Sequence, residues 1–409
     1  MKPNSTSIIR QIDVLILVPA LLLLAIGLAS IYSATLSIPN QSFFERQVIW
    51  SLMGIAIALV IVLSPPRSIY YSAYIWYWLA IAALLAVLIA GKAVSGNAGW
   101  LRIGSFGVQP SEFGKVATVM ALARFLSDSN TRLNDLRDIG KALGLLLLPW
   151  VLIALQPDFG TGLVYLIIFL PVMFWAGAEM FLIIFLLSPV IVGVLAVIGL
   201  YPFLIAAVLL VVVFYLLHRD LGISLFVLVL NLSVGFAVQY FYNALPEYQR
   251  ERIAVFLDPT RDPLNAGYNV IQSKVAIGSG GWFGKGFLHG TQTQLRFIPE
   301  QWTDFIFCVP AEEFGFIGAI VVILLFLVII IRGFYLASQC DSPFTSILVI
   351  GVVSILLAHV FINIGMTLGL LPVIGIPLPL MSYGGSSLLS TMIIMGILLH
   401  SNLYRHRPE

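Results

Sequence analysis

The chain has 409 residues, of which 60% are hydrophobic and 10% are charged, and its formal net charge is +2. Soluble domains carry about 25% charged residues, because a compact fold must cover its surface with polar groups. The composition therefore excludes an ordinary soluble domain and predicts an integral membrane protein. A charge so near neutrality gives no indication of a nucleic-acid partner, and two cysteines, Cys308 and Cys340, are too few for a disulfide framework.

The first apolar run extends from Val14 to about Tyr32 and follows Lys2 and Arg10. It is long enough to span about 30 Å of hydrocarbon at about 1.5 Å per residue, and longer than the apolar part of a signal peptide. We expect a retained first helix.

Apolar stretches along the rest of the chain predict an all-α, polytopic transmembrane bundle of about twelve helices, with ten as the alternative. The whole chain, 1–409, is expected to be one membrane domain. The expected helices cover residues 14–33, 47–64, 69–91, 111–127, 140–155, 160–177, 181–199, 202–217, 221–242, 303–331, 345–369 and 386–403.

The positions of Lys and Arg in the connections predict the orientation, because these residues accumulate in cytoplasmic loops. Four lie in the outer connections other than one long loop, and eleven lie in the inner segments: Lys2, Arg10, Arg67, Arg124, Arg132, Arg137, Lys141, Arg219, Arg332, Arg405 and Arg407. Both termini are therefore predicted to be cytoplasmic, with the segment 243–302 in the periplasm.

This segment, 243–302, is too long for a simple connector, and its aromatic and aliphatic content argues against disorder. Residues 268–277 have helical apolar spacing, and the stretch from Gly278 to Gly290 contains six glycines. We expect a partly helical loop that folds back on the membrane surface and lines a cavity.

Motifs of soluble enzymes are absent from the sequence. The stretch 278–286 lacks the first glycine and the final Ser or Thr of a phosphate-binding loop, and there is no G-x-S-x-G, H-E-x-x-H or Cys/His metal cluster. His289 and His359 stand alone, so packing or hydrogen bonding is expected for both.

Two clusters of charged residues carry candidate chemistry near the predicted outer side. Glu112 and Lys115, at the start of the fourth helix, have the i, i+3 spacing of an ion pair, and either serve the reaction or only neutralise each other at the membrane interface. Asp258 precedes Pro259 and follows the apolar run 253–257. It is either a turn residue or a poorly solvated carboxylate suited to general-base work.

Two further clusters lie closer to the C-terminus. Thr303 or Asp304 is expected to cap the helix 303–331, in which Glu312 and Glu313 would lie about two turns deeper in an apolar span. The loop 371–387 ends in Gly384-Gly-Ser-Ser, whose backbone N–H groups would suit a pyrophosphate at the next helix start, unless the loop is only a connector.

Taken together, long motifs in this chain resemble the SEDS family (shape, elongation, division and sporulation), and more closely its elongation, RodA-like branch than its division branch. The resemblance covers nearly the whole chain. It rests on Gln109-Pro-Ser-Glu112, Gln156-Pro-Asp158-Phe-Gly160, Phe256-Leu-Asp258-Pro259, the stretches 267–274, 277–281, 284–286 and 289–294, Pro299-Glu-Gln-Trp-Thr303-Asp304, and Pro377-Leu-Pro-Leu-Met-Ser382-Tyr-Gly-Gly-Ser386.

The resemblance implies a peptidoglycan glycosyltransferase that polymerises lipid II during cell-wall elongation in the bacterial inner membrane. It also implies a class B penicillin-binding protein, a PBP2-like transpeptidase, as partner. Asp258 matches the family's essential carboxylate, and Glu112 and Lys115 match its fourth-helix ion pair. Family members usually have ten helices, so the surplus is expected between about residues 180 and 242. The family's basic residue before Trp100 is Gly99 here, which leaves a cation role at that position in doubt.

On this basis Asp258 is expected to take the proton from the acceptor sugar's 4-hydroxyl as it attacks the anomeric carbon, with inversion and loss of undecaprenyl pyrophosphate. Candidates for the charge that stabilises this leaving group are Lys115, Lys274, Arg250 and a divalent cation, Mg²⁺ or Mn²⁺, for which there is no ligand motif. Contacts with substrate are also expected from Glu112, Asp304, Gln292, Ser382 and Gly384. The alternatives are a lipid II flippase and a non-catalytic scaffold for the penicillin-binding protein.

Overall fold

The computed structural model describes residues 13–36, 38, 42–90, 92–94, 97–103, 106–244 and 267–406. Asp258 and Arg250 lie outside these residues. Helices occupy all twelve expected regions: α2 (Val14–Thr35), α3 (Phe43–Leu63), α4 (Ser68–Ala90), α5 (Pro110–Leu126), α6 (Leu136–Ala154), α7 (Phe159–Trp175), α8 (Met180–Ile198), α9 (Leu200–His218), α10 (Leu221–Ala244), α15 (Gly315–Gln339), α16 (Pro343–Thr367) and α17 (Gly385–Tyr404).

Among the described residues, nine of these helices are long and apolar enough to cross a membrane, and α5, α6 and α7 are shorter or carry more charge. The predicted polytopic, all-α fold is thereby confirmed. Two short helices lie outside these regions, α12 (Tyr268–Ser279) and α13 (Thr291–Gln294), and a third, α14 (Cys308–Glu313), lies within the expected region 303–331. The helical spacing of residues 268–277 correctly predicted α12.

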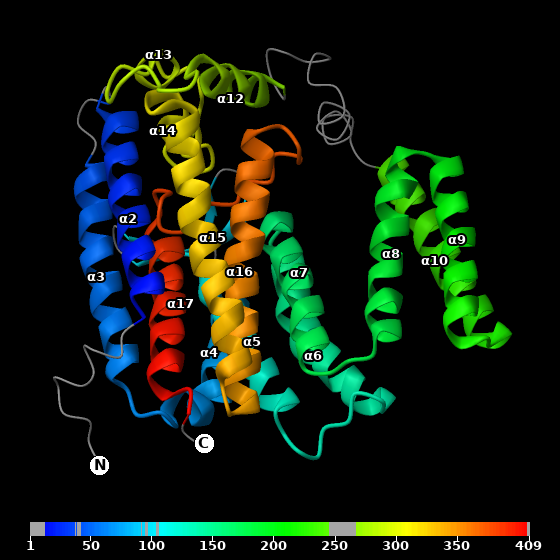
Figure 1. Ribbon diagram of the computed structural model, residues 1–409. Helices are drawn as coiled ribbons and strands as arrows, with labels where there is room; N and C mark the ends of the chain where they lie inside the picture. The colour runs from blue at the N-terminus through cyan, green and yellow to red at the C-terminus, as the bar shows by residue number, and fades with distance from the viewer. Residues whose placement is uncertain are drawn as a thin grey trace.

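The helices run antiparallel between two ends of the bundle (Figure 1). The α12 end carries α12, α13 and α14, whereas the terminal end carries the first and last described residues. Within the main bundle α16 and α17 are the most buried long helices, and α2, α3, α5, α7 and α15 pack around them. The loop from α16 to α17 enters the bundle, because α17 begins well below the tops of α2 and α16 in Figure 1.

Helices α8, α9 and α10 form a three-helix unit beside the main bundle, whose main contact with it is between α7 and α8. Buried polar groups hold the unit together: the Asn231 amide donates to the Ser188 hydroxyl at 3.1 Å and to its own helix at Val227. Polar side chains in this role are typical of helices that pack inside a membrane. The unit contains the two additional helices expected between 180 and 242, although the break falls at Gly199 rather than at Pro202, which sits in the first turn of α9.

The predicted bounds of the helix 303–331 are wrong. Residues 301–307 form turns, α14 ends at Glu313, and the long helix α15 starts only at Gly315 and continues to Gln339. The reason is a close backbone contact. Gly315 has φ +66°, and a Cβ there would lie 2.4 Å from the amide nitrogen of Gly284, so the chain bends to accept the glycine-rich loop. Glu312 and Glu313 are therefore not embedded in a spanning helix.

A small antiparallel sheet fills the connection between α4 and α5, where no strand was expected. It consists of β1 (Lys92–Val94), β2 (Asn97–Ile103) and β3 (Phe106–Val108) in the order β1-β2-β3. Two of the strands have three residues each, which is too short for an alternating pattern to be recognised. The sheet leads the chain directly to Gln109 and the first turn of α5.

Candidate active site

The predicted ion pair on α5 exists and lies inside the bundle. Lys115 Nζ is 2.8 Å from Glu112 Oε1, and the side chains are only 1% and 5% exposed. The same ammonium lies 2.7 Å from Nε2 of His359 on α16. Two of its three N–H groups therefore have partners among the described residues, and the pair is buried rather than placed at the lipid interface.

Two polar side chains on one face of α16, at positions i and i+4, tie neighbouring segments together. These are His359 and Asn363. His359 Nδ1 is 3.2 Å from the carbonyl of Pro377. The Asn363 amide donates to the backbone carbonyls of Asp304, at 2.8 Å, and Ile376, at 2.7 Å.

The loop 371–384 is held inside the bundle mainly by hydrogen bonds to its backbone. The Ser382 hydroxyl donates to the carbonyl of Thr303 at 2.6 Å and accepts from the amide of Leu378 at 2.7 Å. The Gln47 side chain donates to the carbonyl of Ser382 and accepts from the amide of Gly384. Both Ser382 and Gly384 therefore have a structural task, and their predicted contact with substrate stays a prediction.

The first turns of α5 and α17 are joined at the end of this loop. The Ser390 hydroxyl donates to the backbone carbonyl of Glu112 at 2.9 Å, and the amide of Gln109 donates to the Ser386 hydroxyl at 3.0 Å. The first helical bond of α17 runs from the amide of Leu388 to Gly384, so the amides of residues 385–387 precede it. The start of α17 thus lies beside the first turn of α5, which also carries the buried ion pair.

Asp304 joins the same region from the segment after α13. Its carboxylate lies near Gly375, where an added Cβ would be 3.2 Å from Oδ2. Burial, with a smaller contribution from the Glu300 carboxylate, raises the pKa of Asp304 to about 6. A carboxyl group with such a pKa can exchange a proton near neutral pH, although Asp304 was expected to contact substrate rather than to titrate.

Two other predicted residues make their contacts elsewhere. Lys274 is exposed on α12 and lies against Gly369, just after α16, where a positive charge complements the helix dipole. Gln292 sits in α13, and its backbone amide donates to Glu312 at 2.9 Å. The described contacts place both outside the group formed by Glu112, Lys115, Ser382, Gly384 and Asp304, and their roles toward substrate stay predictions.

Glu312 and Glu313 anchor the glycine-rich loop. Glu312 is fully buried and accepts from Lys285 Nζ at 2.7 Å, while Glu313 accepts from the Ser33 hydroxyl and from the amide of Leu288. Gly284, at φ +79°, approaches the carbonyl of Glu313 so closely that a Cβ would be 2.1 Å from it. The glycines therefore allow close backbone packing, and the loop folds back onto α14 as a structural element.

Among the described residues, no group of three or more His, Cys, Asp and Glu side chains could hold a metal ion. The divalent cation therefore stays a prediction, and the mechanism below uses only the chain's own residues.

Comparison with known proteins decides the family. The model of the cell cycle protein family FtsW/RodA/SpoVE matches residues 12–205 and 202–407. The chain belongs to this family. Similar curated relatives are the peptidoglycan glycosyltransferase MrdB of Escherichia coli K12, 37% identical over 393 residues, and the peptidoglycan glycosyltransferase RodA of Treponema pallidum, 34% identical over 426. These alignments cover 95% and 96% of this chain and 94% and 98% of the relatives.

Solved structures agree with the family assignment. A chain of a peptidoglycan synthase complex that coordinates polymerization and crosslinking is 28% identical, with a TM-score of 0.75 over 97% of this chain and 99% of that one. RodA of Thermus thermophilus, 24% identical over 97% of this chain and 98% of that one, shares the fold with a TM-score of 0.65. The chain is thus a multi-pass membrane glycosyltransferase of cell-wall synthesis, and the flippase and scaffold alternatives are not supported.

Sequence reasoning did not assign His359, Asn363 or Gln47 to the site, although the hydrogen bonding expected for His359 is confirmed. A signal for the first two was present: polar residues four apart in a long apolar helix face the bundle interior, because they are expensive to expose to lipid. Gln47 gave no comparable signal, since its partners are backbone groups of a loop more than 300 residues away.

Proposed function

We propose that this glycosyltransferase polymerises lipid II at the α12 end of the bundle. The hydroxyl of the acceptor sugar loses its proton to the Asp258 carboxylate and bonds to the anomeric carbon of the lipid-linked chain. The bond from that carbon to the pyrophosphate breaks, and undecaprenyl pyrophosphate leaves. The buried Lys115 and the amides at the start of α17 favour the negative leaving group electrostatically.

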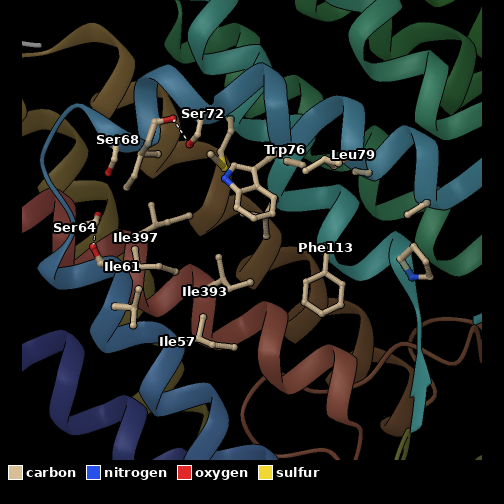
Figure 2. A pocket seen from close by; sticks show the side chains of 18 of the residues that line it. Ile57, Ile61, Ser64, Ser68, Ser72, Trp76, Leu79, Phe113, Ile393 and Ile397 are labelled. Carbon is tan, nitrogen blue, oxygen red and sulfur yellow. Dashed lines mark hydrogen bonds between the residues drawn. The ribbon is translucent and has the colours of Figure 1, made fainter. Parts of the chain in front are cut away.

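The proposal of a lipid-linked substrate rests on an apolar cavity of about 770 Å³ beside the site (Figure 2). Pro110 and Phe113 line it, on the turn of α5 that also carries Glu112. The cavity continues along α4 from Ala83 to Ser68, which is about 22 Å at about 1.5 Å per residue. A hydrocarbon chain could therefore lie along most of the membrane thickness while its pyrophosphate reaches α5.

The serine hydroxyls in the cavity wall are already bonded. The hydroxyls of Ser64 and Ser68 each donate to a carbonyl of their own segment at 2.7 Å, and Ser72 does so at 3.4 Å. The other lining side chains are apolar, such as Ile397 in Figure 2, apart from the indole N–H of Trp76. Such a wall offers a ligand mainly dispersion and hydrophobic contact, which suits a polyprenyl tail.

The test is polymerisation of lipid II by the purified protein, with a variant that narrows the cavity. Ala83 lines the cavity, whereas its neighbour Ala82 is exposed and does not. We expect Ala83→Trp to raise the KM for lipid II with its full undecaprenyl tail much more than for lipid II with a shortened tail. Ala82→Trp should change neither. Equal effects of the two substitutions would mean that the cavity holds ordinary lipid, and no glycan from wild-type protein would refute the activity itself.

Asp258 needs a separate test, because it lies outside the described residues. We expect Asp258→Asn to abolish glycan synthesis while membrane insertion and expression stay normal, since the amide cannot accept the proton. Near-normal synthesis by the Asn variant would exclude the general-base role.

We also propose that both termini are cytoplasmic and that the α12 end faces the periplasm. The described Lys and Arg residues support this orientation. Arg67, Arg124 and Arg332 lie toward the terminal end of the bundle, and such residues accumulate on the cytoplasmic side. A cysteine replacing Arg219 should react only with reagent on the cytoplasmic side, and one replacing Lys274 only from outside. The opposite pattern would reverse the model.

A class B penicillin-binding protein is the partner we propose, since polymerised strands must be crosslinked and one similar structure comes from a complex that coordinates the two activities. Co-purification from membranes with a transpeptidase that binds labelled penicillin would support this partner. Recovery of the chain without any penicillin-binding protein under mild detergent would argue against it.

A further inference from the structure

Lys115, Glu112 and His359 form a hydrogen-bonded chain whose proton positions follow from its two ends. A lysine ammonium can only donate, so at 2.7 Å the Nε2 atom of His359 must accept. The ring proton then resides on Nδ1, which lies 3.2 Å from the carbonyl of Pro377, an acceptor only. Both contacts require the same tautomer of a neutral imidazole.

This arrangement links two parts of the site that are far apart in sequence. Lys115 belongs to α5, whereas Pro377 opens the stretch that leads through Ser382 to the start of α17. Both contacts of the ring are direct, at 2.7 and 3.2 Å, and the His359 side chain is only 4% exposed. The ring fixes the distance between the buried ammonium and the loop backbone.

We propose that His359 is a positioning residue for glycosyl transfer, whose Nε2 atom holds the Lys115 ammonium in place. This inference rests on the proposed function, and it assigns His359 no contact with substrate. Lysine has a long, flexible side chain, and an ammonium that serves a developing charge is effective only when it is held in place beforehand. Glu112 supplies the opposite charge, and His359 supplies a neutral acceptor that orients the Lys115 ammonium without neutralising its charge.

Substitutions at His359 can separate the two contacts atom by atom. Glutamine places its Oε1 as many bonds from Cβ as histidine places Nε2, so His359→Gln keeps an acceptor for Lys115. Asparagine places its Nδ2 where Nδ1 stands, so His359→Asn keeps the donor toward Pro377 and loses the contact with Lys115. His359→Leu removes both.

We expect His359→Gln to keep kcat for lipid II polymerisation within about threefold of wild type. His359→Asn and His359→Leu should lower kcat about ten- to hundredfold with a smaller change in KM, which is the effect of losing a hydrogen bond to a charged group in the transition state. If the Gln and Asn variants are equally active, or the Gln variant is the poorer one, the inference is overturned.

His400 on α17 provides the matched control. It is also 4% exposed, and its Nε2 has no hydrogen-bond partner among the described residues. The same three substitutions at His400 should change the melting temperature without the Gln-against-Asn difference in kcat. An equal Gln-against-Asn difference at His400 would show that burial alone explains the effect.

A second measurement tests the contact independently of activity. In thermal unfolding, Lys115→Met combined with His359→Asn should be less destabilising than the sum of the single changes, because the contact is already lost in either one. Additive effects would overturn the inference. If wild-type protein makes no glycan from lipid II, the proposed function fails, and the unfolding cycle still decides whether His359 holds Lys115.

Discussion

The buried carboxylate of Glu312 offers the sharpest test of what holds the loop 280–294. Its Oε1 accepts from Lys285 Nζ at 2.7 Å and from the amide of Gln292 at 2.9 Å, and its Oε2 accepts from the amide and hydroxyl of Thr293 at 3.0 and 2.8 Å. Burial alone would raise the pKa of this carboxyl, but the Lys285 ammonium and the amides of Gln292 and Thr293 bring it below its ordinary value. Glu312 therefore stays ionised and stabilises the folded loop.

Glu312→Gln keeps the shape of the side chain but turns one acceptor into an N–H donor. The new amide group faces either Lys285 or Thr293, both of which donate. Breaking a buried ion pair costs about 3–5 kcal/mol when the remaining charge is sealed from water. Lys285 is 24% exposed, so water can solvate its ammonium, and we expect a loss of about 3 kcal/mol.

The assay is the unfolding of purified protein in detergent, with Lys285→Met and the double variant alongside. Lys285→Met should be the worse single change, because it leaves a fully buried carboxylate without its counter-ion. The double variant should lose less unfolding free energy than the two single variants lose together. Glu179→Gln is the control, since Glu179 is exposed and makes no side-chain cap to α8.

The pH dependence of unfolding tests independently whether the charge of Glu312 stabilises the folded protein. A carboxyl whose folded pKa is lowered stabilises the protein above its unfolded pKa of about 4.3, and this contribution disappears as the pH falls toward the folded value. The difference between wild type and Glu312→Gln should therefore shrink below about pH 4. A difference under about 1 kcal/mol at neutral pH, or full additivity in the double variant, would refute the reasoning.

Two further predictions concern neighbouring residues. Burial and the Glu300 carboxylate raise the pKa of Asp304 to about 6, so the folded state binds a proton that the unfolded state releases. The free energy of unfolding should therefore fall as the pH rises from about 4 to about 6. Asp304→Asn should lack this fall, and a variant with the same pH dependence as wild type would contradict the prediction. Gly284→Ala should destabilise the protein by more than about 2 kcal/mol, since its Cβ would meet the carbonyl of Glu313 at φ +79°, whereas Gly278→Ala in α12 meets nothing within 4 Å and should be neutral or stabilising in the same melting assay.

The helices were predictable because the bilayer imposes a simple rule on them. Each span needs about 20 apolar residues with its backbone bonds satisfied internally, so composition alone locates it. The rule fails at 303–331, where an apolar composition continues through a break. That break depends on Gly284 and Gly315 meeting backbone to backbone across 31 positions of sequence, which no local pattern records.

The candidate site was only partly predictable for a related reason. The spacing of Glu112 and Lys115 is local, and the pair was found. The third member, His359, lies 244 positions away, and a single histidine in an apolar helix is equally compatible with simple packing. For Ser382 the motif predicted a contact with substrate, which stays a prediction, but gave no sign that the hydroxyl bonds to Thr303 and, within the loop, to Leu378.

The resemblance implies ten helices, whereas helices occupy twelve expected regions of the described residues, and the difference bears on the topology. Chain direction alternates from one span to the next, so an even number of additional helices returns the chain to the same end of the bundle, whereas one more helix would place α12 to α14 at the other. The three-helix unit α8–α10 contacts the main bundle chiefly through α7, and the side-chain N–H groups of its buried Asn231 donate to Ser188 and Val227 within the unit. The two pieces of the family match meet at 202–205, inside α9. The unit therefore lies beside the main bundle and makes its main contact away from α5, α16 and α17, which surround Lys115.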